Sequence, residues 1–297
     1  MGKTEFCAHK ASSHHKVLML LFFVILCLSF FPPLSSSSSL SFDFYAGTCP
    51  AAEMVVKNTV RSASDLDPTI PGKLLRLLFH DCFVEGCDAS VLLQGNGTER
   101  SDPANKSLGG FSVIDAAKRM LEIFCPETVS CADILALAAR DAVEFAGGPN
   151  IQIPTGRRDG KISLAANVRP NIIDTSFTLD EMAKAPTQLE QLIAAHSTTG
   201  SSSTQMEISV IDSSLDRQYA AQLTKLCTSS ATDDSVTVSN DPGTPLLFDN
   251  QYYRILLQHK GLFQSDSALL DDERTRNRVL EFANNQIVSM RGGLHLF

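Results

Sequence analysis

Three kinds of chemically useful side chain fall within the stretch from Arg76 to Ser90, which reads RLLFHDCFVEGCDAS. Arg76 and His80 are four residues apart, so on a helix they lie on one face and reach into a common space. A neutral imidazole beside a fixed cation has a lowered proton affinity and is available as a base, while the cation can stabilise negative charge on a small polar substrate. The same pair is also compatible with a core histidine beside an arginine that extends to the surface.

Hard oxygen donors follow this pair directly. The candidates are the side chains of Asp81, Asp88 and Ser90 and the backbone carbonyls of Val84 and Gly86. Calcium binds roughly six to eight oxygens and accepts carboxylates, hydroxyls and carbonyls together. Cys82 and Cys87 bracket the segment, and a short disulfide loop would fix the directions of the carbonyls. The segment therefore predicts a calcium site, with a solvated acidic turn as the alternative.

Helices must position these residues, because strand-like alternation is scarce in the chain. Spaced apolar residues with polar faces between them predict helices over residues 51–64, 74–84, 111–124, 130–146, 214–227, 248–259 and 272–286. Asp67, Pro68 and Pro71 mark the start of the helix that carries His80, since prolines are tolerated where the first N–H groups lack partners. We predict an all-α architecture without internal repeats.

The first forty residues have the pattern of a secretory signal. A basic start is followed by an apolar run of fourteen residues, Val17 to Phe30, and then by prolines and a serine tract. A membrane span needs about twenty apolar residues, so we expect a cleaved signal and no membrane association afterwards. The remaining chain, residues 41–297, is long enough for one large domain or two lobes. The net charge of the full chain, −8, argues against a nucleic-acid or anionic-membrane partner.

Two of the eight cysteines, Cys7 and Cys27, belong to the predicted signal. The six that remain are Cys49, Cys82, Cys87, Cys125, Cys131 and Cys227. An even count in an oxidising compartment predicts disulfides, although the sequence alone does not choose their pairing. Two glycosylation sequons, at Asn96 and Asn105, fit a secreted protein.

The stretch from Arg76 to Ser90 resembles the distal helix of the secreted plant haem peroxidases of class III. The arginine, histidine, aspartate, two cysteines and serine all fall at the spacings of that family. The resemblance implies a fold of two helical lobes with haem b between them. It also implies reduction of hydrogen peroxide and one-electron oxidation of small phenolic donors by a secreted monomer, located outside the cell or in the cell wall, with the vacuole as an alternative.

The family's site residues map onto this chain one by one. His80 would move a proton of the peroxide and Arg76 would stabilise charge, with Phe79 as the distal aromatic. Asn105 would accept the second N–H of His80, supported by Glu99. Further positions with matching motifs are Pro170 at the substrate mouth, Asp266 as the acceptor from the haem-bound histidine, and Asp241, Thr244 and Asp249 at a second calcium site.

The family pattern also joins Cys49 to Cys125 and Cys82 to Cys87. It gives Cys131 and Cys227 partners that this chain does not contain. Residues 147–160, GGPNIQIPTGRRDG, are a family landmark, and we interpret their two arginines and Asp159 as an interdomain salt-bridge cluster.

The family's proximal motif, Gly-Ala-His-Thr-Ile-Gly, is missing. His196 is the only histidine in the corresponding segment, and neither of its flanks matches. Regrouping the codons from Pro186 to Ile208 can spell His-Thr-Ile-Gly-Ala-Ala-His-Cys-Ser-Ser-Phe-Asn-Asp-Arg-Phe. We therefore hypothesise that residues 185–209 are read out of frame, through mis-splicing, a faulty gene model or a pseudogene, and that the preceding helix is lost. The C-terminus also departs from the family and stops early.

Two functions from different classes follow. The first is a secreted haem peroxidase whose distal half is complete. The second is a catalytically impaired or non-enzymatic calcium-binding remnant that lacks the axial ligand of the haem. A Soret band separates them, because only the first predicts that haem is bound as in a peroxidase.

Overall fold

The computed structural model describes residues 40–172, 214–228 and 238–293, all within one unit of the chain, Leu40–Phe297. Most of the predicted signal, residues 1–39, lies outside the described residues. So do residues 173–213, which include His196 and the segment with the missing motif. No helix among the described residues is long and apolar enough to cross a bilayer.

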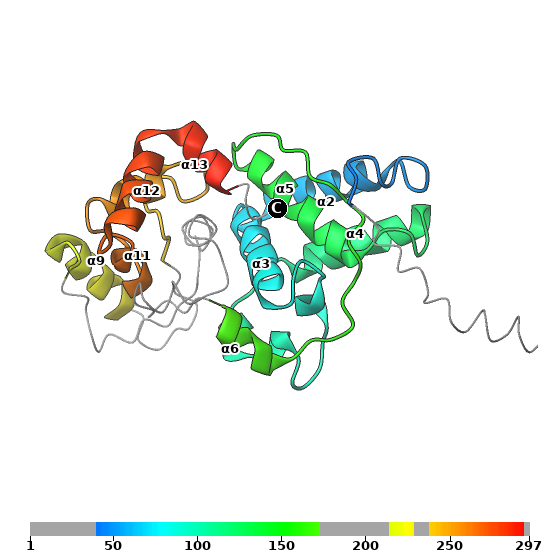
Figure 1. Ribbon diagram of the computed structural model, residues 1–297, viewed down its shortest axis with the longest axis horizontal. Coiled ribbons are helices and arrows are strands. Elements are labelled where there is room, and N and C mark those ends of the chain that lie inside the picture. Colours follow the sequence, from blue (N-terminus) through cyan, green and yellow to red (C-terminus); the bar gives the residue numbers. More distant parts are fainter. Residues whose placement is uncertain (1–39, 173–213, 229–237, 294–297) are drawn as a thin grey trace, which may run out of the picture. The chain divides into compact units, whose positions relative to one another are not determined.

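The described chain is helical, as the sequence predicts. Its α-helices are α2 (Ala52–Leu66), α3 (Ile70–Val84), α4 (Phe111–Phe124), α5 (Cys131–Phe145), α6 (Val168–Asn171), α9 (Arg217–Thr228), α10 (Gln251–Leu256), α11 (Gln264–Ala268), α12 (Glu273–Asn284) and α13 (Gln286–Gly293) (Figure 1). Short 3-10 turns lie at Ser90–Leu92, Glu99–Ser101, Pro103–Asn105 and Ala165–Asn167. The only β-pairing in the described part is an isolated antiparallel bridge between Ser41 and Thr155.

Helix α3, which carries the candidate acid–base pair, begins at Ile70, where Asp67, Pro68 and Pro71 predict its start and four residues before the apolar pattern over 74–84. The Asp67 carboxylate accepts the backbone N–H of Thr69 at 2.9 Å and its hydroxyl at 2.6 Å, which stabilises the turn just before the helix. Pro71 lies in the first turn, where its missing N–H costs nothing. The turn chemistry thus sets the start, and the apolar periodicity begins only later.

Two predicted helices in the C-terminal half have different bounds in the structure. The helix expected over 248–259 is only Gln251–Leu256, because the N–H of Phe248 donates to the Ala146 carbonyl and His259 has a left-handed φ of 56°. The helix expected over 272–286 divides at Asn285 into α12 and α13. Tertiary contacts and local backbone conformation therefore interrupt patterns that look continuous in the sequence.

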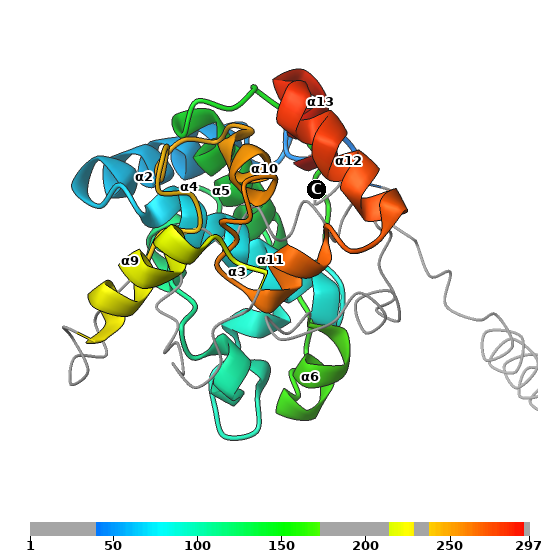
Figure 2. The same cartoon turned by 90° about the vertical axis from the view of Figure 1, so that its left-hand side faces the viewer.

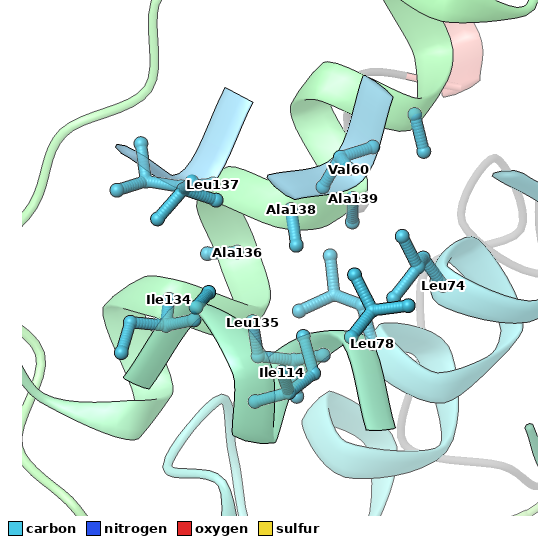
Figure 3. Close-up of a cluster of buried hydrophobic side chains, with 14 of the residues drawn as sticks. Val60, Leu74, Leu78, Ile114, Ile134, Leu135, Ala136, Leu137, Ala138 and Ala139 are labelled. Carbon is cyan, nitrogen blue, oxygen red and sulfur yellow. The ribbon is translucent and has the colours of Figure 1, made fainter. Parts of the chain in front are cut away.

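The main hydrophobic core lies around α5. This helix is buried on nearly all sides, with Ile134, Leu135 and Leu137 fully buried, as expected for a helix that is apolar all round. Figure 3 shows Val60 of α2, Leu74 and Leu78 of α3 and Ile114 of α4 grouped around its side chains. The core therefore fixes α3, and with it the face that bears His80.

A second cluster holds α10 and α12 together (Figure 2). The rings of Tyr253 and Phe282 meet edge to face with centroids 5.1 Å apart. The side-chain amide of Asn250 donates to the carbonyls of Phe282 and Ala283, each at 3.0 Å, and so satisfies carbonyls at the end of α12.

The landmark GGP motif has a packing role in the structure. Gly147 has a φ of +89° and ends α5. A Cβ atom on Gly148 would lie 2.5 Å from Cγ1 of Val143 and 2.8 Å from Cδ1 of Phe248. Glycine is therefore required where the chain around Phe248 packs against the end of α5.

Both expected disulfides are present: Cys49–Cys125 joins the start of α2 to the end of α4, and Cys82–Cys87 closes the loop after α3. Cys131 is a free cysteine at the start of α5. The side chain of Cys227 lies outside the described residues.

The arginine cluster after the GGP motif is organised differently from the prediction. Arg157 pairs with the buried Asp133 at 3.2 Å, and Asp133 also accepts the hydroxyl of Tyr45 at 2.7 Å. Asp159 instead accepts the N–H of Ala132 in the first turn of α5. Asp159 therefore does not pair with Arg157 as predicted. These contacts fasten the 147–160 loop to α5, because the start of a buried helix needs acceptors for its free N–H groups.

Candidate active site and calcium loop

Helix α3 presents Arg76 and His80 on one face, as their spacing predicts. His80 is buried, with an exposed fraction of 4%, whereas Arg76 is half-buried and donates to the Ser107 hydroxyl at 3.1 Å. Phe79 is also buried and meets His80 edge to face, with ring centroids 5.2 Å apart. The pair is therefore held in an environment that contains little water.

The hydrogen bonds of Asn105 assign the proton on His80. Nδ1 of His80 lies 2.7 Å from Oδ1 of Asn105, and Nδ2 of Asn105 donates to the Glu99 carbonyl at 3.0 Å. Because the amide NH2 group faces Glu99, its oxygen faces His80, so Nδ1 carries the hydrogen and donates it. Nε2 is then the ring nitrogen with a free lone pair.

Glu99 supports Asn105 as predicted, through its backbone carbonyl. The carboxylate of Glu99 lies near Ser90 and Asp88 of the oxygen-rich loop after α3.

The pKa of His80 is lowered to about 3, first because burial disfavours the charged ring and second because Arg76 is close. The hydrogen bond to Asn105 opposes this shift but does not cancel it. Burial also lowers the pKa of Arg76, which nevertheless remains a cation at neutral pH. A neutral imidazole beside a cation is the arrangement that the sequence predicts.

Asp81 organises the loop that follows. It is fully buried and accepts the N–H groups of Ala89 at 2.8 Å and Val91 at 3.3 Å. Burial raises its pKa to about 7. The hydroxyl oxygen of Ser90 and both carboxylate oxygens of Glu99 are buried without a hydrogen-bond partner. Buried oxygens in this state are costly unless a donor or a cation satisfies them.

These unsatisfied oxygens fit a calcium ion. Gly86 has a φ of +99°, which turns the chain, and Asp88 is held against Gly160, where a side chain would collide with its carboxylate. The charge of Asp88 also helps to raise the pKa values of Asp81 and Glu99, so the loop concentrates negative charge. No group of three or more histidine, cysteine or acidic side chains forms a metal cluster in the described part of the chain, so a cation here depends on the Ser90 hydroxyl and on carbonyls as well.

The residues expected at a second calcium site do not show the same fit. Oδ2 of Asp241 accepts the Thr244 hydroxyl at 2.6 Å, and its Oδ1 accepts the N–H of Gly243 at 2.8 Å. Asp249 accepts the N–H of Gln251 at 2.8 Å and so begins α10. The two carboxylates therefore already accept hydrogen bonds from groups in their own loops. None of the three residues is buried, and none has a buried oxygen that lacks a hydrogen-bond partner.

Asp266 is fully buried and its carboxylate is held on both sides. Oδ1 accepts the hydroxyl of Tyr252 at 2.6 Å, and Oδ2 accepts the N–H groups of Leu262 at 2.8 Å and Phe263 at 2.9 Å. Burial and the charge of Asp266 raise the pKa of Tyr252 well above 10. The sequence did not identify Tyr252, although a tyrosine in an apolar helix needs a partner for its hydroxyl. The histidine that Asp266 is expected to serve lies outside the described residues.

Pro170 is exposed on α6. Its neighbour Val168 is buried against Val84 at the end of α3, so α6 lies close to the helix that carries His80.

A buried histidine beside an arginine, next to a disulfide-closed oxygen loop and within a described part that is helical, is a combination typical of the haem peroxidases. The family model described as Peroxidase matches residues 56–285, and the chain belongs to this family. It is 61% identical to Peroxidase 46 and 58% identical to Peroxidase 18 of Arabidopsis thaliana, over 84% of this chain and 81% of each relative. It is 41% identical to Peroxidase 5 of Vitis vinifera, over 84% of this chain and 81% of that relative.

These similarities confirm the resemblance to the plant secretory peroxidases, the all-α fold class and the assignment as a peroxidase enzyme. The family implies a haem cofactor, hydrogen peroxide and a reductant as substrates.

The alignment lengths bear on the missing motif. The match to Peroxidase 18 spans 266 positions but covers 84% of this chain's 297 residues, which is about 250 residues. About 16 positions of that relative therefore face gaps in this chain.

Proposed function

We propose that the chain reduces hydrogen peroxide with His80 as its acid–base group and oxidises small phenolic donors by one-electron steps. The observation that carries this proposal is the Asn105 contact, which leaves Nε2 of a neutral, buried His80 free to accept a proton. When bound, haem b would supply the iron at which the oxygen–oxygen bond breaks and the electrons that the donors replace.

The chain's own residues would act as follows. Nε2 of His80 accepts the proton from the inner oxygen of the peroxide and returns it to the outer oxygen, which leaves as water. The Arg76 guanidinium stabilises the negative charge that develops as that bond breaks. Phe79 covers one side of the imidazole and limits the access of water.

Asp266 would accept the N–H of the histidine that would hold the haem. We propose that this histidine is missing from the chain as written, because residues 185–209 lack the family motif and the flanks of His196 do not match. The second candidate function, a calcium-binding remnant, is favoured by this loss together with the orphaned oxygens of Ser90 and Glu99.

The test is to load the full chain with haem and calcium and to compare it with His80→Gln and His259→Gln. His259 is exposed and serves as the control. The peroxidase function predicts a Soret band in all three proteins, and a loss of peroxide-dependent phenol oxidation of about 100-fold or more in His80→Gln alone. Equal activity in all three proteins would refute the role of His80. Absence of the Soret band in all three would select the calcium-binding remnant.

The proposed calcium ion binds Asp81, Asp88, Ser90 and the carbonyls of Val84 and Gly86. The second calcium ion is not part of the proposal, because Asp241 and Thr244 satisfy each other.

The proposal also includes secretion through the signal at residues 1–40, a monomeric state, and a location outside the cell, in the cell wall or in the vacuole. Of the two sequons, Asn96 is exposed in a turn, whereas Asn105 is buried and both ends of its amide are hydrogen-bonded. We therefore assign a glycan to Asn96 only.

A further inference from the structure

Asp102 lies three residues before Asn105 and organises the turn that carries it. Its Oδ1 accepts the N–H of Ala104 at 2.8 Å, so Asp102 is the N-cap of the 3-10 turn Pro103–Asn105. The N–H of Asn105 also donates to the Asp102 carbonyl at 3.0 Å. The side chain of Asp102 is 10% exposed, so this cap operates largely away from water.

Arg169 on helix α6 holds the same carboxylate oxygen. Its Nε lies 3.5 Å from Oδ1 of Asp102, and its side chain is 56% exposed. One helix position earlier, Val168 is fully buried in a small apolar cluster with Val84 and Ile172, against which Ala104 packs. The ion pair and the cluster therefore join α6 to the turn that ends at Asn105.

We propose that Asp102 is a positioning residue for His80 and that Arg169 secures it. The path runs from Arg169 to the Asp102 carboxylate, through the capped turn to Asn105, and from Oδ1 of Asn105 to Nδ1–H of His80. The inference deepens the proposed function, because it concerns the residue to which that function assigns the proton transfer.

Few contacts hold His80 in one tautomer. The two neutral tautomers of an imidazole are close in energy, so the hydrogen bond at Nδ1 selects between them. The peptide segment that presents Asn105 is a single 3-10 turn, which has few internal hydrogen bonds and depends on its cap. Loss of the cap lets Asn105 move, and a proton acceptor displaced by about 1 Å reacts up to about 100-fold more slowly.

The experiment measures the tautomer directly, by 15N NMR of the histidine rings in the full chain at neutral pH and without haem or peroxide. The signals of His80 are identified by their loss in His80→Gln. We expect the wild-type ring to be almost entirely the Nδ1–H form. Asp102→Ala should shift the ring signals toward a mixture of the two forms. Asp102→Asn keeps the cap, because an asparagine oxygen caps as well as an aspartate oxygen, but loses the ion pair, so its shift should be no larger than that of Arg169→Ala.

The matched control is Asp272→Ala. Asp272 is also an N-cap, accepting the N–H of Arg274 at 2.8 Å, and it also pairs with the side chain of Arg274 at 2.9 Å. It begins α12, and removing it should leave the His80 signals unchanged. Arg169→Ala should produce a smaller shift than Asp102→Ala, since an exposed ion pair contributes less than a cap.

A wild-type tautomer in folded Asp102→Ala would overturn the proposal. If Asp102→Ala does not fold, Arg169→Ala decides: a shift in its His80 signals supports the proposal, and unchanged signals overturn it. A shift of equal size in Asp272→Ala would show a general loss of stability and would also overturn it. Failure of the proposed peroxidase function is a separate result. That function is measured as phenol oxidation by the haem-loaded chain, whereas the tautomer is measured without haem or substrates.

Discussion

Oδ1 of Asn105 lies 2.7 Å from Nδ1 of His80, although the two residues are 25 positions apart and only His80 is in a regular α-helix. The opposite end of the amide donates to the Glu99 carbonyl, so the orientation of Asn105 is fixed. One hydrogen bond thus determines which nitrogen of His80 can accept a proton, and burial beside Arg76 determines that the ring is neutral.

The lowered pKa of His80 predicts acid sensitivity. An unfolded histidine binds a proton near pH 6.5, whereas folded His80 does so only near pH 3. Between these values the unfolded state binds more protons, so this contribution to stability is complete above pH 6.5 and is lost progressively down to pH 3. The loss is about 4 to 5 kcal/mol at ~1.4 kcal/mol per pKa unit.

Chemical denaturation at several pH values tests this. The free energy of unfolding of His80→Gln should fall less steeply between pH 6.5 and pH 3 than that of the wild type. His259→Gln, which alters an exposed histidine, should follow the wild type. Parallel curves for His80→Gln and the wild type would contradict the buried, neutral state of His80.

The raised pKa of Asp81 predicts that calcium binding depends on pH. Without the ion, folded Asp81 retains its proton up to about pH 7, whereas an unfolded aspartate loses it near pH 3.8. This group therefore makes the ion-free protein less stable as the pH rises from 3.8 to about 7. A calcium ion must displace that proton below pH 7, and it binds an ionised carboxylate above it.

Melting temperatures with calcium and with a chelator measure the effect. The increase caused by calcium should be larger at about pH 8 than at about pH 6, and Asp81→Asn should reduce it at both pH values. The control Asp249→Asn should keep the increase, because Asp249 accepts an N–H within its own loop. An increase that is lost in Asp249→Asn and kept in Asp81→Asn would place the ion at the other site.

Two buried tyrosines in the C-terminal half should respond differently to the loss of their hydroxyls. Tyr252 donates to Asp266 at 2.6 Å, so Tyr252→Phe removes one of the donors that stabilise a buried carboxylate. We expect a loss of about 1 to 3 kcal/mol in the free energy of unfolding. The hydroxyl of Tyr219 is buried without a hydrogen-bond partner, so Tyr219→Phe should be neutral or slightly stabilising.

Urea denaturation of the two variants beside the wild type provides the comparison. Equal losses would indicate that the hydroxyl of Tyr252 is as poorly satisfied as that of Tyr219, contrary to the 2.6 Å contact.

The hypothesis of an altered reading frame predicts what the genomic DNA encodes in the shifted frame. The codons for Pro186 to Ile208, read from the last base of the Pro186 codon, should spell the proximal motif with its histidine and cysteine, and a coding stretch for the missing helix should lie nearby. Sequencing the locus and the transcript tests this. Synonymous choices that break the motif in the shifted frame would refute the hypothesis. A transcript that contains the helix would locate the fault in the translated sequence.

The sequence determined the local features of this protein. The spacing of Arg76 and His80, the loop closed by Cys82 and Cys87, and the apolar pattern of α4 depend on residues within one or two turns of each other, and the structure confirms the helices and the disulfide. The resemblance to the family then predicted the contact between Asn105 and His80. Periodicity alone could not predict it, because a loop residue has no repeating pattern.

Only the tertiary structure decided which polar groups face each other across the chain. Asp133 rather than Asp159 pairs with Arg157. The Glu99 carboxylate lies near Ser90 and Asp88 while its carbonyl accepts a hydrogen bond from Asn105. Helix α10 begins late, because the N–H of Phe248 donates to Ala146 just after α5. From the sequence alone, a charged or amide side chain has many possible hydrogen-bond or ion-pair partners. The choice is made by the packed core, which brings one partner within reach and excludes water from the others.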